Sequence, residues 1–147
     1  MSLKRIQKEY QKIKKHPLEG LSANPISEDD MFKWEGTIDG PVDTPYEGGK
    51  FKLRITFPQD YPMNPPNIIF TTKIFHPNIS ETYVCLDILQ NKWSPVLSIE
   101  KVLLSLSSLL MDPNPNSPLV ADANNLYVKD REKFNEKVKE WVKKYAS

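Results

Sequence analysis

Prolines divide this chain into short segments. The 147 residues include 13 prolines and five glycines, and two proline clusters stand out, "YPMNPPN" at 61–67 and "DPNPNSP" at 112–118. A proline has no backbone N–H and a fixed φ, so neither cluster can continue a central strand or a helix interior. Both stretches are expected to be stiff connections between regular elements.

The first half of the chain combines one helical pattern with several alternating ones. Apolar residues at helical spacing predict an amphipathic helix that ends before Pro17 and turns four basic side chains outward, Lys4, Arg5, Lys8 and Lys12. Residues 31–38, 50–57 and 67–72 are typical of strands, with the turn signals "DGP" and "EGG" between them. We expect an antiparallel meander of about four strands with one buried face.

The second half of the chain begins with a long irregular stretch. Residues 71–98 have no sustained periodicity, and long ordered loops in compact domains are usually functional. Ser98 can cap a central helix whose apolar stripe runs to Leu110. A short segment over 119–127 and a last helix with apolar positions over 134–145 follow. The chain is therefore expected to form a single α+β domain over residues 1–147.

Composition excludes several classes of protein. The single cysteine, Cys85, cannot form an internal disulfide, and no apolar run approaches the ~20 residues that span a bilayer. A reducing cytosol or nucleus is the simplest compartment. Residues 1–15 carry +5 and the remainder −4, which favours a local docking face over a nucleic-acid protein. No metal-ligand spacing or phosphate-binding loop occurs, so no metal is expected.

Several motifs occur together in one order: "TTKIFHPNI", "CLDIL", "WSP", "SLL", "DPNP" and "PLVAD". With them the chain resembles the ubiquitin-conjugating enzyme family over essentially its whole length, and most closely its short, extension-free members that work with many RING and HECT ligases. The resemblance implies the family's UBC fold. It also implies an acyltransferase whose Cys85 accepts ubiquitin as a thioester and passes it to a lysine or a ligase cysteine. A nucleophilic carrier splits one hard step into two easier ones.

The resemblance implies further site residues around Cys85. Asn78 is a candidate donor to the oxyanion that develops during attack by lysine, and bracing of the loop is its alternative role. Asp87 either orients or helps deprotonate the incoming lysine, or is a solvated loop carboxylate. A protease-like pair of His76 with Cys85 is disfavoured, because the family's histidine holds a tight turn. Support of the active-site loop is expected from His76, Pro77, Leu86, Ser117 and Asp122.

Two departures from the family pattern lie near the thiol. Relatives commonly have seven residues, including a glycine, between the histidine motif and the cysteine, whereas "ISETYV" has six and no glycine. Six residues can span roughly 20 Å when extended, but the separation of Asn78 and Cys85 is left open. Close relatives also carry an acidic pair where this chain has Asn116 and Ser117, so a second acid near the thiol is missing.

Three protein-binding surfaces follow from the resemblance. The activating enzyme and RING, U-box or HECT ligases are expected to dock on Lys4, Arg5, Lys8, Pro62, Met63, Trp93, Ser94, Pro95 and Val96. A donor ubiquitin is expected along Lys101, Leu104 and Ser108, and a second, noncovalent ubiquitin on the opposite sheet face at Ser22, Lys52 and Arg54. Electrostatic steering supports the first surface. The plain alternatives are a solvated basic helix face and the ordinary polar face of a sheet.

Two other functions stay open. A noncatalytic ubiquitin-binding scaffold would have the same fold, although the presence of Cys85 argues against it. A conjugator of a ubiquitin-like modifier would share the chemistry. In each case we expect a monomer that needs no cofactor of its own, since the upstream activating enzyme uses the ATP, and that has no nucleic-acid or membrane partner.

Overall fold

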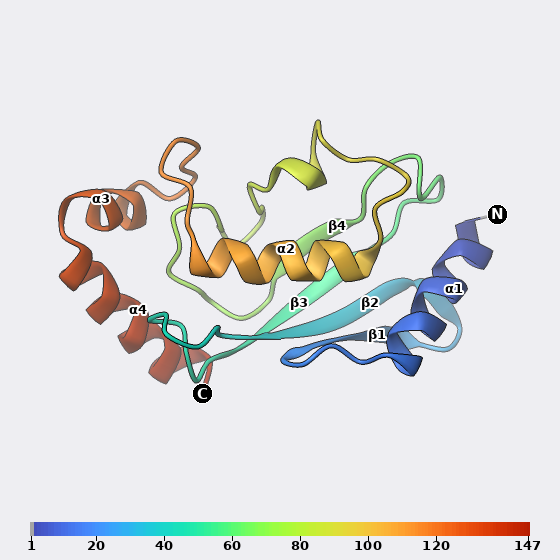
Figure 1. The fold of residues 1–147 in the computed structure, drawn as a ribbon, viewed down its shortest axis with the longest axis horizontal. Coiled ribbons are helices and arrows are strands. Elements are labelled where there is room, and N and C mark those ends of the chain that lie inside the picture. Colours follow the sequence, from blue (N-terminus) through green and yellow to red (C-terminus); the bar gives the residue numbers. More distant parts are fainter. Residues whose placement is uncertain (1) are drawn as a thin grey trace.

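The computed structural model describes residues 2–147. The elements follow in the order α1 (Ser2–Lys15), β1 (Leu21–Ser27), β2 (Asp30–Asp39), β3 (Lys50–Thr56), β4 (Asn67–Phe70), the 3-10 turn η1 (Asp87–Leu89), α2 (Ile99–Met111), α3 (Ala121–Lys129) and α4 (Arg131–Tyr145). Figure 1 shows α2 across the middle of the sheet, α1 at one end, and α3 and α4 at the other. The predicted α+β arrangement is confirmed.

The sheet is an antiparallel meander in the order β1-β2-β3-β4, as predicted. Along β3 the side chains of Phe51, Leu53 and Ile55 are buried, whereas Lys52 and Arg54 between them are exposed. This period-2 alternation gives the sheet one face toward the core and one toward solvent. The long stretch after β4 contains only η1 and isolated β-bridges over residues 76–84, in agreement with its lack of periodicity.

The strand β1 is the one strand whose position the sequence pattern does not indicate. Its sequence "LSANPIS" is mostly polar, and Ala23 is its only buried residue. Pro25 also argues against a central strand, but β1 lies at the edge of the sheet, where a missing N–H costs little. The pairing with β2 shifts register between Pro25 and Ser27, which accommodates the ring.

The central helix α2 supplies much of the core. Its buried residues are Ile99, Val102, Leu103, Leu106, Leu109 and Leu110. The Ser98 side chain caps the helix by accepting a hydrogen bond from the Lys101 N–H (3.3 Å), as predicted. Within residues 2–147, no helix is both long and apolar enough to cross a membrane.

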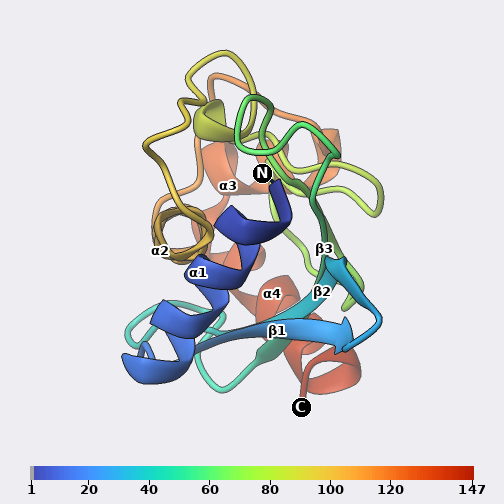
Figure 2. The same cartoon turned by 90° about the vertical axis from the view of Figure 1, so that its right-hand side faces the viewer.

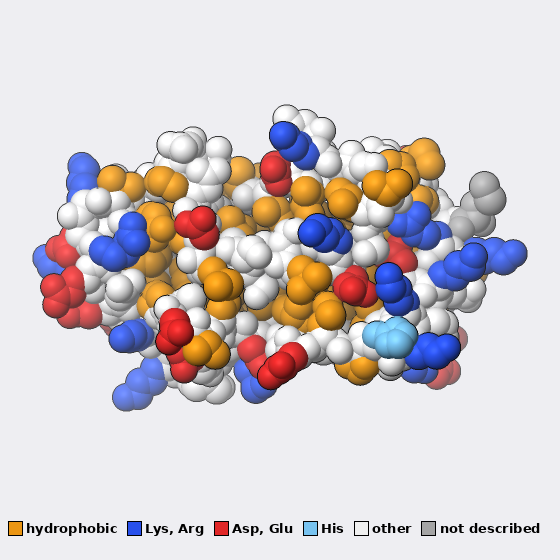
Figure 3. Space-filling model, viewed as in Figure 1, with side chains coloured by type: hydrophobic (Ala, Val, Ile, Leu, Met, Phe, Trp, Pro, Cys, Tyr) orange, Lys and Arg blue, Asp and Glu red, His pale blue; other side chains and the backbone are white. Residues whose placement is uncertain are grey.

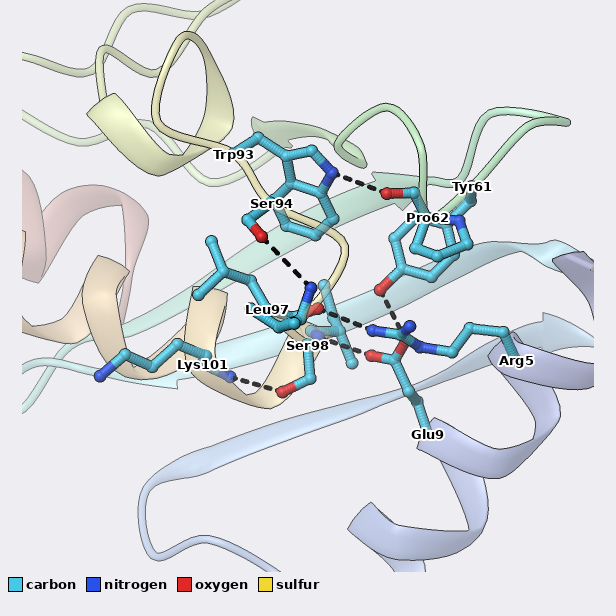
Figure 4. A network of polar contacts seen from close by, with 11 residues as sticks. Arg5, Glu9, Tyr61, Pro62, Trp93, Ser94, Leu97, Ser98 and Lys101 are labelled. Carbon is cyan, nitrogen blue, oxygen red and sulfur yellow. Dashed lines mark hydrogen bonds and ion pairs between the residues drawn. The ribbon is translucent and has the colours of Figure 1, made fainter.

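The buried carboxylate of Glu9 joins α1 to two other segments (Figure 4). Its Oε1 accepts a hydrogen bond from the N–H of Ile99, the first residue of α2 (2.7 Å), and its Oε2 accepts one from the Tyr61 hydroxyl (2.6 Å). The carboxylate thus lies at the N-terminus of α2, where the helix dipole favours negative charge. Burial, and then the hydrogen bond to Glu9, raise the pKa of Tyr61, which keeps this hydroxyl a neutral donor.

The expectation that Arg5 faces outward with the neighbouring lysines is wrong. Its guanidinium donates to the Glu9 carboxylate (2.8 Å) and to the Leu97 carbonyl oxygen (2.8 Å), and it lies 5.7 Å from the centre of the Tyr61 ring. A buried carboxylate needs a paired cation, and Arg5 is one helical turn away from it. The three lysines Lys4, Lys8 and Lys12 are exposed.

We expect Glu9→Ala to lower the free energy of unfolding by roughly 3 kcal/mol, because Ile99, Tyr61 and Arg5 would lose their acceptor inside the protein. Urea unfolding at pH 7, followed by tryptophan fluorescence, measures the change. Glu140→Ala, at an exposed glutamate of α4, is the matched control and should stay within about 0.5 kcal/mol of the parent. Equal midpoints for the two variants would show that the Glu9 contacts do not stabilise the fold.

Candidate active site

The segment before Cys85 folds into a small β-hairpin. Ile79 and Val84 form an antiparallel bridge. One position further from the tip, the Cys85 N–H donates to the Asn78 carbonyl oxygen (2.9 Å). This ladder places Asn78 directly across from Cys85, where the Cα atoms of an antiparallel pair are about 5 Å apart. The hairpin thus sets the separation of Asn78 and Cys85, which the sequence left open.

The tip of the hairpin closes without a glycine because Ser80 serves as a local hydrogen-bond partner. The Ser80 N–H donates to the Tyr83 carbonyl oxygen (2.9 Å). The Ser80 hydroxyl accepts from the N–H groups of Thr82 (3.4 Å) and Tyr83 (3.1 Å). Serine hydroxyls commonly satisfy turn N–H groups in this way. Six residues are therefore enough to return the chain to the thiol.

The direction of the Cys85 side chain follows from the burial of its neighbour. Ile79 and Val84 are both buried in the core. Because successive residues of an extended segment point to opposite faces, the residues on either side of Val84 point to the other face, where the buried Asn78 lies across from Cys85. Cys85 is a free thiol and is partly exposed. The chain's only sulfhydryl is thus partly accessible to solvent.

The turn that precedes the hairpin is built around a fully buried imidazole. His76 Nδ1 accepts a hydrogen bond from the Asn78 N–H (3.0 Å), so Nε2 carries the proton and donates to the Leu109 carbonyl oxygen (2.8 Å). Burial lowers the pKa of His76 to about 4, and the ring is neutral at pH 7. Since both nitrogens are engaged within the fold, His76 is not available as a base for Cys85, and a protease-like pair is excluded.

The same turn fixes the loop between α2 and α3. The Asn78 side-chain amide donates to the carbonyl oxygens of Asn114 (2.8 Å) and Ser117 (2.9 Å), and its Oδ1 accepts from the Asn114 N–H (2.8 Å). The Pro77 carbonyl oxygen accepts from the N–H groups of Leu119 (2.8 Å) and Val120 (3.1 Å). Both amide hydrogens of Asn78 are therefore used for bracing, and donation to a reacting oxyanion would require the exchange of one of these bonds.

Acidic side chains near the thiol are few. Asp87 is exposed at the start of η1, two residues after Cys85, and its side chain has no hydrogen bond or ion pair within residues 2–147. Leu86, between them, is half-buried and packs against the core. Ser117 is exposed and contributes only its backbone to the loop, and Asp122 is exposed in the first turn of α3. Asp87 is thus the acid nearest to Cys85 along the chain.

Six of the nine residues expected at the docking face lie on two adjoining loops, Pro62 and Met63 on one and Trp93, Ser94, Pro95 and Val96 on the other. The Trp93 indole N–H donates to the Pro62 carbonyl oxygen (2.9 Å), which joins two loops (Figure 4). On these loops Met63 is 65% exposed and Val96 is 87% exposed. Ser94 and Pro95 lie between Trp93 and Val96 in the same loop. Figure 3 shows Lys and Arg side chains over the α1 end of the molecule.

The two other predicted surfaces also consist of neighbouring residues. On α2, Lys101, Leu104 and Ser108 are exposed and lie at helical spacing, and Leu104 is 41% exposed although burial is usual for leucine. On the outer face of the sheet, Ser22 pairs with Thr37, which in turn pairs with Lys52. Arg54 follows two residues along the same strand. Each surface is therefore continuous.

A cavity of about 560 Å³ lies beside the hairpin. Apolar side chains line most of it: Ile69, Phe70, Ile74, Ile79, Val120 and Trp141. Cys85 is not among the lining residues, so this cavity does not surround the thiol.

Comparisons with known proteins identify the family and the fold of this chain. The sequence model of a family described as "Ubiquitin-conjugating enzyme" matches residues 5–142. Among solved structures, the E2 domain of a Toxoplasma gondii ubiquitin-conjugating enzyme is 41% identical in sequence, with a TM-score of 0.92 and complete coverage of both chains. The predicted UBC fold is thereby confirmed.

We expect His76 to make the stability of the protein depend on pH. Its pKa is 6.5 when unfolded and about 4 in the native state, so between these values the unfolded chain binds a proton that the native protein excludes. The free energy of unfolding therefore falls as the pH is lowered, by about 2 kcal/mol from this group between roughly pH 7.5 and 5. Urea unfolding across this range should show that His76→Gln has lost that share of the pH dependence.

His16→Gln is the matched control, because it removes the chain's other imidazole, which is exposed at the end of α1. A parent protein and a His76→Gln variant with the same pH dependence would contradict the assignment of a buried, neutral His76.

Proposed function

We propose that this chain, which belongs to the ubiquitin-conjugating enzyme family, accepts ubiquitin from an activating enzyme as a thioester on Cys85 and transfers it to a substrate lysine or a ligase cysteine. The observation that carries the proposal is the position of Cys85. It is the only cysteine, it is free and partly exposed, and it lies at the base of a hairpin braced by buried polar groups.

The reaction consists of two acyl transfers. In the first, the Cys85 thiolate attacks the thioester carbonyl of ubiquitin on the activating enzyme, and the thiolate of that enzyme leaves. In the second, a neutral lysine amine attacks the new thioester, Cys85 leaves as a thiolate, and the amine loses a proton. The first exchange is nearly isoenergetic, and the thioester stays activated toward an amine. The ATP is spent upstream, so the chain needs no cofactor.

Asn78 and Asp87 are proposed to act in the second transfer. The amide of Asn78, across the hairpin from Cys85, holds the loop over 114–117, and an exchange of one of these bonds would provide a donor for the oxyanion. The Asp87 carboxylate lies two residues after Cys85 and has no partner within residues 2–147. A lysine has a free pKa near 10.4, so a carboxylate that orients the amine or takes up its proton assists attack near pH 7.

The exposed surfaces are proposed to bind the protein partners. Met63 and Val96 present apolar side chains to a ligase, and the exposed Lys4 and Lys8 on α1 would attract acidic groups of the activating enzyme. The stripe of Lys101, Leu104 and Ser108 on α2 would support the donor ubiquitin. The outer sheet surface with Ser22, Lys52 and Arg54 would bind a second, noncovalent ubiquitin. A cytosolic or nuclear location would keep the thiol reduced.

We expect the protein to form a thiol-sensitive adduct with ubiquitin when it is incubated with activating enzyme and ATP. Intact mass and a non-reducing gel detect it. Cys85→Ala should form none, and Cys85→Ser should form an adduct that resists reducing agents, because an ester replaces the thioester. No adduct with the parent would favour a noncatalytic scaffold. An adduct with a ubiquitin-like modifier but not with ubiquitin would identify that modifier as the substrate.

We expect Asn78→Ala and Asp87→Ala to accept ubiquitin but to discharge it slowly to free lysine. Loss of the Asn78 amide should slow discharge on the order of a hundredfold. Asp87→Ala should discharge slowly near pH 7 and recover as the pH rises toward the lysine pKa of about 10.4. A single-turnover discharge assay over pH 6.5–9.5 measures both, with the exposed Asp112→Ala as control. If either variant discharges ubiquitin at the parent rate, the substituted residue has no role in the second transfer.

We expect Met63→Asp and Val96→Asp to weaken the acceleration of discharge by a RING ligase, because each places a charge on an exposed apolar contact. Discharge without a ligase should remain at the parent rate. Val128→Asp is the matched control, since Val128 is an exposed apolar side chain on α3. Full ligase stimulation in both docking variants would place the ligase on a different surface.

A further inference from the structure

Tyr83 shares the outward face of the hairpin with the thiol. Tyr83 and Cys85 lie on either side of Val84, whose side chain is buried in the core. Alternate residues of an extended segment point to the same side, so the phenol ring and the sulfhydryl both lie on the face opposite the Val84 side chain. Residues two apart in a strand are on the order of 7 Å apart, which is within the reach of a tyrosine side chain.

The ring of Tyr83 has no structural task in the fold. It is 45% exposed, it stacks on no other aromatic ring, and its hydroxyl has no hydrogen-bond partner within residues 2–147. The turn instead uses the backbone of Tyr83, which bonds to Ser80. A large apolar ring that is left in solvent beside a nucleophile is available to a visiting molecule.

The position of Tyr83 relative to α2 indicates whether its ring is near the donor ubiquitin or near the attacking amine. The thiol is followed by η1 and then α2, whereas Tyr83 precedes it in the hairpin. In Figure 2 the yellow-green segment that contains the hairpin lies on the side away from α2. If the donor ubiquitin lies against the exposed stripe of α2, the thioester is left open on the hairpin side. The attacking amine then passes the Tyr83 ring.

We infer that Tyr83 forms the acceptor-side wall of the thioester site and contacts the methylene stem of the incoming lysine. Lysine has four methylene groups below its amine, and these gain from contact with an aromatic face while the amine reaches the carbonyl carbon. The inference rests on the proposed function and names a residue that selects the acceptor. It predicts a preference for amines that carry an aliphatic stem.

The test compares two amines of different shape in single-turnover discharge of the ubiquitin thioester without a ligase. Free lysine has the stem, and hydroxylamine has none. Tyr83→Ala should lower the second-order rate constant for lysine about tenfold, as expected for loss of contact with roughly two methylene groups. Its rate constant for hydroxylamine should equal that of the parent. Each variant is compared with the parent on the same amine, so the intrinsic reactivity of the amine cancels.

Tyr83→Phe keeps the ring and should match the parent with both amines, and Thr82→Ala, at the exposed neighbouring position, should do the same. Equal slowing of Tyr83→Ala with lysine and hydroxylamine would overturn the inference, because it would indicate a disturbed hairpin. Unchanged or faster discharge to lysine would overturn it as well. The loading step of the same experiment reports on the proposed function separately, since Tyr83 is not needed for an adduct to form.

Discussion

The buried hydrogen bonds of the turn His76–Pro77–Asn78 hold the candidate site together. The turn contacts three segments: the His76 ring bonds to the end of α2, the Pro77 carbonyl and the Asn78 side chain bond to the loop over 114–120, and the Asn78 carbonyl bonds to Cys85. Each buried polar group here has a partner, and a buried donor or acceptor that lost its partner would cost about 1–3 kcal/mol. The thiol is therefore presented by a rigid scaffold even though it lies in a long irregular stretch.

The helix α2 is fastened at both ends by buried side chains from distant parts of the chain. Glu9 accepts from the N–H of Ile99 in the first turn, and His76 donates to the carbonyl oxygen of Leu109 in the last turn. Both backbone groups belong to the sets that a helix cannot satisfy internally. The Glu9 contact lies next to the proposed docking loops (Figure 4). The His76 contact belongs to the turn that also bonds to Cys85, so a single rigid helix connects the two regions.

Structural elements that depend on near neighbours in sequence could be predicted. Proline clusters predicted the breaks, helical periodicity and Ser98 predicted α2, and alternation predicted β2 and β3, because local sterics and one buried face decide these elements. Nonlocal contacts could not be predicted in this way. Arg5 turns inward only because Glu9 is buried between α1 and α2, and the amide of Asn78 is used by carbonyls 36 and 39 residues away. The six-residue hairpin depends on a serine hydroxyl that replaces the usual glycine.

The central claim is that this scaffold holds the Cys85 thiol at the surface, open to a protein tail. The rate of alkylation of Cys85 by iodoacetamide, measured in the native protein and in concentrated guanidinium chloride, tests it most directly. An accessible thiol should react in the native protein within about tenfold of its unfolded rate. Protection by a thousandfold or more, with alkylation that follows global unfolding, would show a sealed sulfur and contradict the account.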